Sequence, residues 1–244
     1  MGHPRLQVAS PESLADAFAR EFTATANEAL ARRGRCVVAI PGGSAAEHLL
    51  PRLAREPLPW EAVHVFWCDE RAVPVADSLS NAGAAALFLA GTRAAGARFH
   101  PMPADGSNPA AAADQYAADL RQTTGDDWRL DLVLLGVGED GHIASLFPGH
   151  PALSETRKSV LPIFDAPKSP PRRMTLTLPV LAGARLVVVA AFGAGKAEAI
   201  RDAVEGDAQT PVARILEQAG QVVLLLDEAA ASLLGRGVID RSVT

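Results

Sequence analysis

Asp140 and His142 are the residues of this chain whose types and spacing best suit proton-transfer chemistry. They lie in a glycine-rich segment that directly follows the apolar run from Leu132 to Leu135. A histidine titrates near neutral pH, so it can act as a general base, and a nearby carboxylate can orient its ring. The alternative is a histidine that only satisfies a loop hydrogen bond. A zinc site is not expected, because further ligands at suitable spacing are missing.

The same segment contains a Gly-x-Gly-x-x-Gly pattern at residues 136–141, which can indicate a dinucleotide-binding turn. A pyrophosphate needs bare backbone N–H groups at a helix N-terminus, whereas Glu139 and Asp140 would bring negative charge there. Pro148 also leaves little room for the helix that must follow. We therefore predict no dinucleotide site.

Two other glycine-rich turns could bind an anion at the start of a helix. Gly42, Gly43 and Ser44 precede an expected helix, and either a tight turn or a ligand seat would explain them. Lys196 ends the segment 193–196 and would lie near the positive end of a helix dipole, where a cation is unfavourable. A bound phosphate would compensate, so we favour a phosphate seat here.

A charged cluster, Asp69-Glu70-Arg71, follows another apolar run. It could be a surface turn held by its own ion pairs, which contribute little when exposed. Arg71 could instead reach into a cleft and bind an anion. The residues alone leave both interpretations open.

The elements that must position these residues alternate along the chain. Strands are predicted at 35–40, 62–68, 130–136, 173–178, 185–192 and 221–226, and helices at 11–33, 45–54, 80–90, 110–122 and 194–204, after Thr210 and after Asp227. Residues 98–109 and 165–172 are predicted to be loops. This pattern favours an α/β fold, a doubly wound, mostly parallel sheet with helices on both faces, in a single domain over residues 1–244. The loops after four strands would then meet at one edge of the sheet.

Composition narrows the class of protein. The 244 residues carry a net charge of −5, which argues against a nucleic-acid partner. Leu186 to Phe192 is the longest apolar run and is far shorter than the roughly 20 residues of a membrane helix. The N-terminus lacks the apolar core of a signal peptide. Cys36 and Cys68 are expected to be buried free thiols, which fits a cytoplasmic protein, and whether Cys68 reacts is left open.

Five segments in this order resemble the 6-phosphogluconolactonase family: PGGS at 41–44, DERAVP at 69–74, GVGEDGHIASLFPGH at 136–150, RMTLTLPVL at 173–181 and FGAGKAEAI at 192–200. The resemblance implies a Rossmann-like fold shared with glucosamine-6-phosphate deaminase, ribose-5-phosphate isomerase and coenzyme A transferases. It implies hydrolysis of 6-phosphoglucono-δ-lactone, a sugar-phosphate lactone, in the oxidative pentose phosphate pathway. No metal or organic cofactor is expected, and no obligate protein partner is evident.

The resemblance also suggests roles for individual residues. His142 would be the general base on water, Asp140 would orient it, and Arg71 or backbone N–H groups would stabilise the oxyanion. Substrate and phosphate contacts are expected from Gly42, Gly43, Ser44, Asp69, Arg173 and Lys196, with Arg172 as the alternative to Arg173. Arg71 is also expected to help bind the phosphate. The 165–172 loop is expected to close over the cleft.

Two other functions compete with lactone hydrolysis. Deaminases of the same fold continue their Gly-His turn with Phe-Asn-Glu-Pro, whereas residues 144–148 here read ASLFP and contain no acid. A phosphosugar-sensing transcription regulator would need a DNA-binding module. Residues 1–40 predict one long helix and a strand instead of a basic helix-turn-helix.

Overall fold

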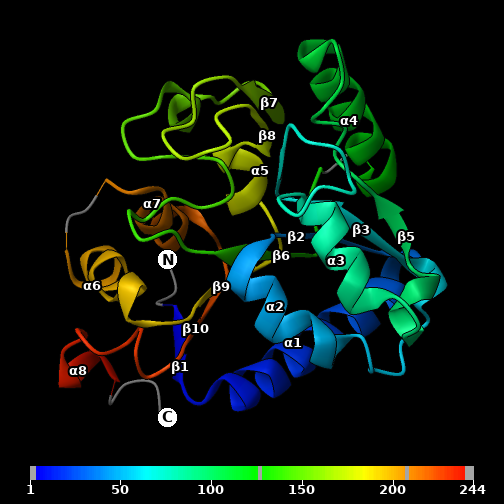
Figure 1. The fold of residues 1–244 in the computed structure, drawn as a ribbon. Coiled ribbons are helices and arrows are strands. Elements are labelled where there is room, and N and C mark those ends of the chain that lie inside the picture. The colour runs from blue at the N-terminus through cyan, green and yellow to red at the C-terminus, as the bar shows by residue number, and fades with distance from the viewer. Residues whose placement is uncertain (1–3, 126–127, 207–208, 240–244) are drawn as a thin grey trace.

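A seven-stranded parallel sheet forms the centre of the molecule (Figure 1). The computed structural model describes residues 4–125, 128–206 and 209–239. The strand order is β1-β10-β9-β6-β2-β3-β5, and each neighbouring pair is parallel. The strands span Arg5–Val8 (β1), Cys36–Ile40 (β2), Val63–Trp67 (β3), Arg98–His100 (β5), Leu132–Gly136 (β6), Leu186–Ala191 (β9) and Val222–Leu226 (β10). The predicted parallel sheet is confirmed.

A second, three-stranded sheet lies beyond the C-terminal end of β3. Its order is β4-β8-β7, and both pairs are antiparallel. The strands are β4 (Asp69–Arg71), β7 (Val160–Ile163) and β8 (Arg173–Leu176). The backbone N–H of Cys68 donates to Ile40 O, and Cys68 O accepts from Leu176 N, so this residue joins the two sheets. The sequence analysis predicted only β8 as a strand of this sheet.

Helices occupy the connections between the strands. They are α1 (Pro11–Arg33), α2 (Gly43–Leu53), α3 (Asn81–Leu89), α4 (Pro109–Thr124), α5 (Leu178–Ala182), α6 (Ala197–Glu205), α7 (Pro211–Gln218) and α8 (Arg236–Ile239), with 3-10 turns η1 (Trp60–Ala62), η2 (Arg93–Gly96), η3 (Pro151–Ser154) and η4 (Ala194–Lys196). Helix α2 packs against α1 and α3, whereas α7 packs against α5 and α6. Because crossovers between parallel strands are right-handed as a rule, and the chain moves along the sheet in opposite directions through α2 and through α6 and α7, these two groups are expected on opposite faces of the sheet.

Helix α1 shows how local sequence sets an element. Its N-cap Ser10 accepts a hydrogen bond from Ser13 N, Pro11 occupies the first turn, and Gly34 ends the helix with φ of 68°. Phe18 and Phe22 face the core and are buried. The predicted helix at 11–33 is therefore confirmed to the residue.

Several predicted boundaries were wrong. Residues 98–100 form the edge strand β5 and not a loop, and β8 ends at Leu176 because a helix begins at Leu178. The segment after Asp227 forms turns before α8. The helix predicted from Ala194 begins as η4, which leaves Lys196 at the N-cap position of α6.

The core is continuous across both sheets. Strand residues such as Val133 and Leu224 of the large sheet and Met174 of the small one belong to the same buried apolar cluster. Cys36 and Cys68 are buried free thiols, as expected. Across the described ranges, no helix is both long enough and apolar enough to cross a membrane.

Candidate active site

Four loops meet at one edge of the large sheet, as the parallel topology predicts. The segments that follow β2, β3, β6 and β9 contain Ser44 at the start of α2, Arg71 in β4, His142 in a loop and Lys196 in η4, respectively. The chain leaves β3 for the small sheet at once, so Arg71 lies in β4, directly opposite Arg173 of β8. No helix begins between Gly136 and Pro151, which supports the rejection of a dinucleotide site.

His142 and Asp140 form a hydrogen-bonded pair. The imidazole Nδ1 lies 2.5 Å from Asp140 Oδ1, and the ring packs on Phe147 with 4.6 Å between ring centroids. Gly138 is required beside this pair, because a Cβ there would lie 1.9 Å from His142 Nδ1. If Nδ1 donates to the carboxylate, the lone pair is on Nε2, which is the arrangement of a general base.

The charge states of the pair follow from its surroundings. Burial lowers the pKa of His142 below its usual value, although the hydrogen bond that the imidazole donates to Asp140 and the negative charge of Asp140 act in the opposite direction. Burial raises the pKa of Asp140, but the hydrogen bond and charge of His142 and the charge of Lys168 outweigh it and leave the pKa below its ordinary range. At neutral pH the site therefore holds a neutral imidazole next to an ionised carboxylate.

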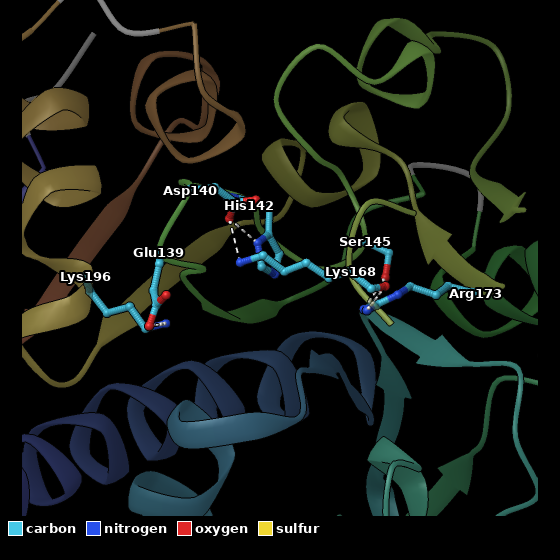
Figure 2. A network of polar contacts seen from close by, with 7 residues as sticks. All are labelled: Glu139, Asp140, His142, Ser145, Lys168, Arg173 and Lys196. Atoms are coloured by element: carbon cyan, nitrogen blue, oxygen red, sulfur yellow. Dashed lines mark hydrogen bonds and ion pairs between the residues drawn. The ribbon is translucent and has the colours of Figure 1, made fainter. Parts of the chain in front are cut away.

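Lys168 is a member of the site that the sequence analysis did not single out. Its Nζ lies 3.3 Å from Asp140 Oδ1, the same oxygen that contacts His142 (Figure 2). Its segment was predicted as an irregular loop, which the structure confirms. The closure of this loop over the cleft stays a prediction. A lysine in such a loop has no characteristic spacing to a partner, so the composition of the loop was the only available signal.

Arg173 is buried, with 6% of its surface exposed, and is largely occupied by backbone oxygens. Its Nε donates to Pro170 O at 2.9 Å, and its Nη2 donates to Lys168 O at 3.0 Å and Ser169 O at 3.4 Å. Nη1 lies 3.4 Å from Ser145 Oγ. Arg173 thus holds the loop that carries Lys168. Arg172 is exposed and lies one residue before the strand.

The interpretation of residues 69–71 as a turn held by its own ion pairs is wrong. Asp69 and Glu70 are only 5% and 3% exposed. Asp69 accepts a hydrogen bond from Ser145 Oγ at 2.6 Å and another from Asn81 Nδ2 at 3.2 Å. Glu70 accepts from the backbone of Asn81 and thereby fixes the start of α3.

The Arg71 guanidinium donates from Nη1 to the backbone oxygen of Leu79 at 2.6 Å. Its Nε is a buried donor that finds no partner in the part of the chain that the structure describes. An unsatisfied buried donor is costly unless another group binds it.

The predicted phosphate seats lie at helix starts. Helix α2 begins at Gly43 without a side-chain cap, so its first N–H groups are available to an anion. Asn81 Oδ1 lies so close to Gly42 that a Cβ would come within 1.9 Å of it. Lys196 Nζ lies 4.0 Å from Glu139 Oε1, and this carboxylate would lie 2.9 Å from a Cβ at Gly195 (Figure 2).

The site therefore combines a poised imidazole with several cations and free helix N–H groups. Such an arrangement can activate water next to a bound anion. Within the described residues, no group of three or more His, Cys, Asp and Glu side chains could hold a metal ion.

The chain is similar to known proteins over most of its length. Residues 9–224 match the family model described as glucosamine-6-phosphate isomerases/6-phosphogluconolactonase. The 6-phosphogluconolactonase of Bos taurus is 40% identical, over 92% of this chain and 91% of its own. The 6-phosphogluconolactonase of Synechocystis is 37% identical, over 87% of this chain and 90% of its own.

Solved structures show the same fold. A 6-phosphogluconolactonase from Shewanella baltica superposes with a TM-score of 0.82 at 25% identity, over 93% of this chain and 98% of its own. The 6-phosphogluconolactonase from Trypanosoma brucei superposes with a TM-score of 0.78 at 29% identity, over 95% of this chain and 99% of its own. A monomeric glucosamine-6-phosphate deaminase superposes with a TM-score of 0.77, over 94% of this chain and 99% of its own. It is 21% identical, so the similarity is one of fold alone. The chain belongs to the glucosamine-6-phosphate isomerase/6-phosphogluconolactonase family.

Proposed function

We propose that this chain hydrolyses 6-phosphoglucono-δ-lactone to 6-phosphogluconate, as the names of its relatives state for those proteins. The observation that carries the proposal is the 2.5 Å contact between His142 Nδ1 and Asp140 Oδ1, which directs the basic Nε2 lone pair away from the carboxylate. This activity places the protein in the oxidative pentose phosphate pathway.

His142 carries the proton through both steps of the proposed reaction. Nε2 takes a proton from water while the water oxygen bonds to the lactone carbonyl carbon, which gives a tetrahedral oxyanion. The oxyanion collapses, the bond from that carbon to the ring oxygen breaks, and the imidazolium returns the proton to the leaving oxygen. Asp140 stabilises the imidazolium in between.

The phosphate is proposed to bind at the N-terminus of α2, between Gly43, Ser44 and Lys196. Free N–H groups, the helix dipole and the ammonium support this placement. Gly42 permits close approach of the chain, and Arg173 contributes through the Nη1 group that faces Ser145.

We propose that residues of the small sheet bind the oxyanion and the sugar. The buried Nε of Arg71 has no hydrogen-bond partner among the residues that the structure describes, which supports its role as an oxyanion donor. Asp69 is proposed to contact the substrate from the same strand, although its present hydrogen bonds to Ser145 and Asn81 give it a structural role as well.

The absence of an acid in residues 144–148 favours hydrolysis over deamination of glucosamine 6-phosphate. The cytoplasmic location and the lack of metal, organic cofactor and obligate protein partner remain predictions. Plant relatives are named as chloroplastic.

The test follows lactone hydrolysis above the spontaneous rate, with the lactone generated in place by glucose-6-phosphate dehydrogenase. The wild-type protein should accelerate it, and His142→Ala should lose at least about 10² in kcat while keeping its fold. Full activity in His142→Ala would remove the base assignment. A folded wild type that releases ammonia from glucosamine 6-phosphate, and leaves the lactone untouched, would overturn the reaction itself.

A further inference from the structure

Lys168 reaches the His142–Asp140 pair from a different part of the chain. It belongs to the loop between β7 and β8, and its Nζ lies 3.3 Å from Asp140 Oδ1. The imidazole Nδ1 contacts the same oxygen at 2.5 Å. One carboxylate oxygen is thus shared by an ammonium and an imidazole, as the dashed lines in Figure 2 show.

The backbone that carries Lys168 is fixed. Arg173 binds the carbonyl oxygens of three consecutive residues, Lys168, Ser169 and Pro170. The loop is also closed by a hydrogen bond of 3.0 Å from Ala166 N to Pro171 O. A long, flexible lysine gains a defined position only if its own backbone is held, and here a buried arginine holds it.

The charges around His142 give Lys168 a distinct electrostatic effect. Asp140 in the same loop and Asp69 of β4 raise the pKa of the imidazole, whereas Lys168 and, most of all, burial lower it. Of the three described charged groups that act on His142, two are carboxylates and Lys168 alone is positively charged. The fourth neighbour, Phe147, packs on the ring and carries no charge.

We propose that Lys168 is a positioning residue for the reaction, which fixes the Asp140 carboxylate against His142 and keeps the imidazole available as a base. It acts through Asp140 and need not touch the reacting atoms. The proposal rests on the proposed function for its kinetic consequence, but the arrangement of the three side chains can be tested without substrate.

The test compares Lys168→Met with wild type in two ways. NMR titration of the histidine side chains reports the protonation of His142 directly, with its signal assigned by its loss in His142→Gln. Without Lys168, His142 should take up its proton at a higher pH. The acidic limb of kcat/KM, which reports the free enzyme, should move in the same direction, so that activity lost at pH 6 is recovered near pH 8.

Two further variants sharpen the comparison. Lys168→Arg keeps the positive charge and should restore both the titration and the pH profile towards wild type. Lys158→Met removes an exposed lysine of the preceding segment and should change neither. Thermal unfolding of each variant checks that the fold is intact.

The outcomes separate this proposal from the proposed function. An unchanged His142 titration in Lys168→Met, including one with a uniform loss of activity at every pH, would overturn the positioning role. A shifted titration in a protein that does not hydrolyse the lactone would overturn the proposed function and leave the positioning role standing.

Discussion

Glu139 brings a carboxylate to the place where we propose that the substrate phosphate binds. Its Oε1 lies 4.0 Å from Lys196 Nζ and packs against Gly195 at the start of η4. The Glu139 side chain is 70% exposed, so solvent weakens the pair to at most about 1 kcal/mol. A dianionic phosphate must compete with Glu139 for Lys196, and it can displace so weak a partner.

Glu139→Gln should therefore lower KM for the lactone, by up to about fivefold, since 1.4 kcal/mol corresponds to a factor of ten. kcat should stay unchanged, because Glu139 does not contact His142. Initial-rate kinetics at low ionic strength measure both. Glu198→Gln, which removes an exposed acid from the first turn of α6, is the matched control. An equal drop in KM in both variants would reveal a general charge effect and not a local competition.

Single-residue chemistry was only partly predictable from sequence. Asp140 and His142 could be identified because they follow a strand at short spacing, and a direct contact confirms that they pair. Lys168 lies 28 residues from its partner Asp140, so only the folded chain brings them together. The buried role of Glu70 was hidden for the same reason, because its hydrogen bonds go to the start of a helix that follows a loop.

The glycine-rich loop after β6 shows how an element shapes the pair it carries. Gly138 leaves space for the His142 ring, because a Cβ at this position would come within 1.9 Å of Nδ1 and 2.7 Å of Asp140 Oδ1. Both atoms belong to side chains that can move aside. A methyl group here should consequently displace the pair and leave the loop backbone in place.

Gly138→Ala should lose about 10² or more in kcat, comparable to the loss of a general base, with a small change in melting temperature. Steady-state kinetics and thermal unfolding test the two halves of this prediction. Gly136→Ala is the control in the same segment, because the nearest described atom to its Cβ would be Ala45 Cβ at 3.4 Å, an ordinary contact distance. Near-normal kcat in Gly138→Ala would mean that the pair is not needed in the observed geometry.

The edge of the large sheet carries a pair of histidines that predicts sensitivity to acid. His64 Nδ1 of β3 and His100 Nε2 of β5 lie 3.0 Å apart, and Phe66 stacks on His100. Burial, and to a smaller extent the charges of His100, Arg98 and Arg35, together lower the pKa of His64 to about 4. The hydrogen bond needs one unprotonated nitrogen, so two imidazolium rings would repel each other.

The folded pKa of His64 lies below the unfolded value of about 6.5. Its stabilising contribution is therefore complete above pH 6.5 and is lost as the pH falls towards 4. His64→Gln should flatten the decline of the melting temperature between these two values. His48→Gln, in α2 and outside the pair, should leave the decline as in wild type. Parallel curves for wild type and His64→Gln would show that the pair does not govern acid stability.

Elements were predictable where their pattern was long. The 23 residues of α1 have a cap, an apolar face and a glycine stop, and the buried strands β2, β6, β9 and β10 are apolar throughout. The strands β4 and β5 have three residues each, and β1 and β7 have four, too few to show a period. Their pairing depends on partners distant in sequence, which is why the small sheet was missed.

At the scale of the whole molecule, the two sheets share one apolar core. Ile163, Met174 and Leu176 of the small sheet belong to the same cluster as Val133 and Leu224 of the large one. Cys68 links the sheets through backbone hydrogen bonds on both sides. The small sheet thus shares its core with the large sheet. If the chain is a single domain, as predicted, the small sheet cannot stay folded when the large sheet unfolds.

The chain should thus unfold in one cooperative transition. Urea titration followed by far-UV circular dichroism and by tryptophan fluorescence should give coincident curves. Hydrogen exchange should show that peptides from β8 and β9 become unprotected at the same urea concentration, because both depend on the shared core. Bound 6-phosphogluconate should move the whole transition, by about 2.7 kcal/mol at a hundred times its Kd, since it binds the folded state alone. Loss of protection in β7 and β8 at lower urea than in β9 would instead identify the small sheet, with its Lys168 loop, as a separately folding unit of the site.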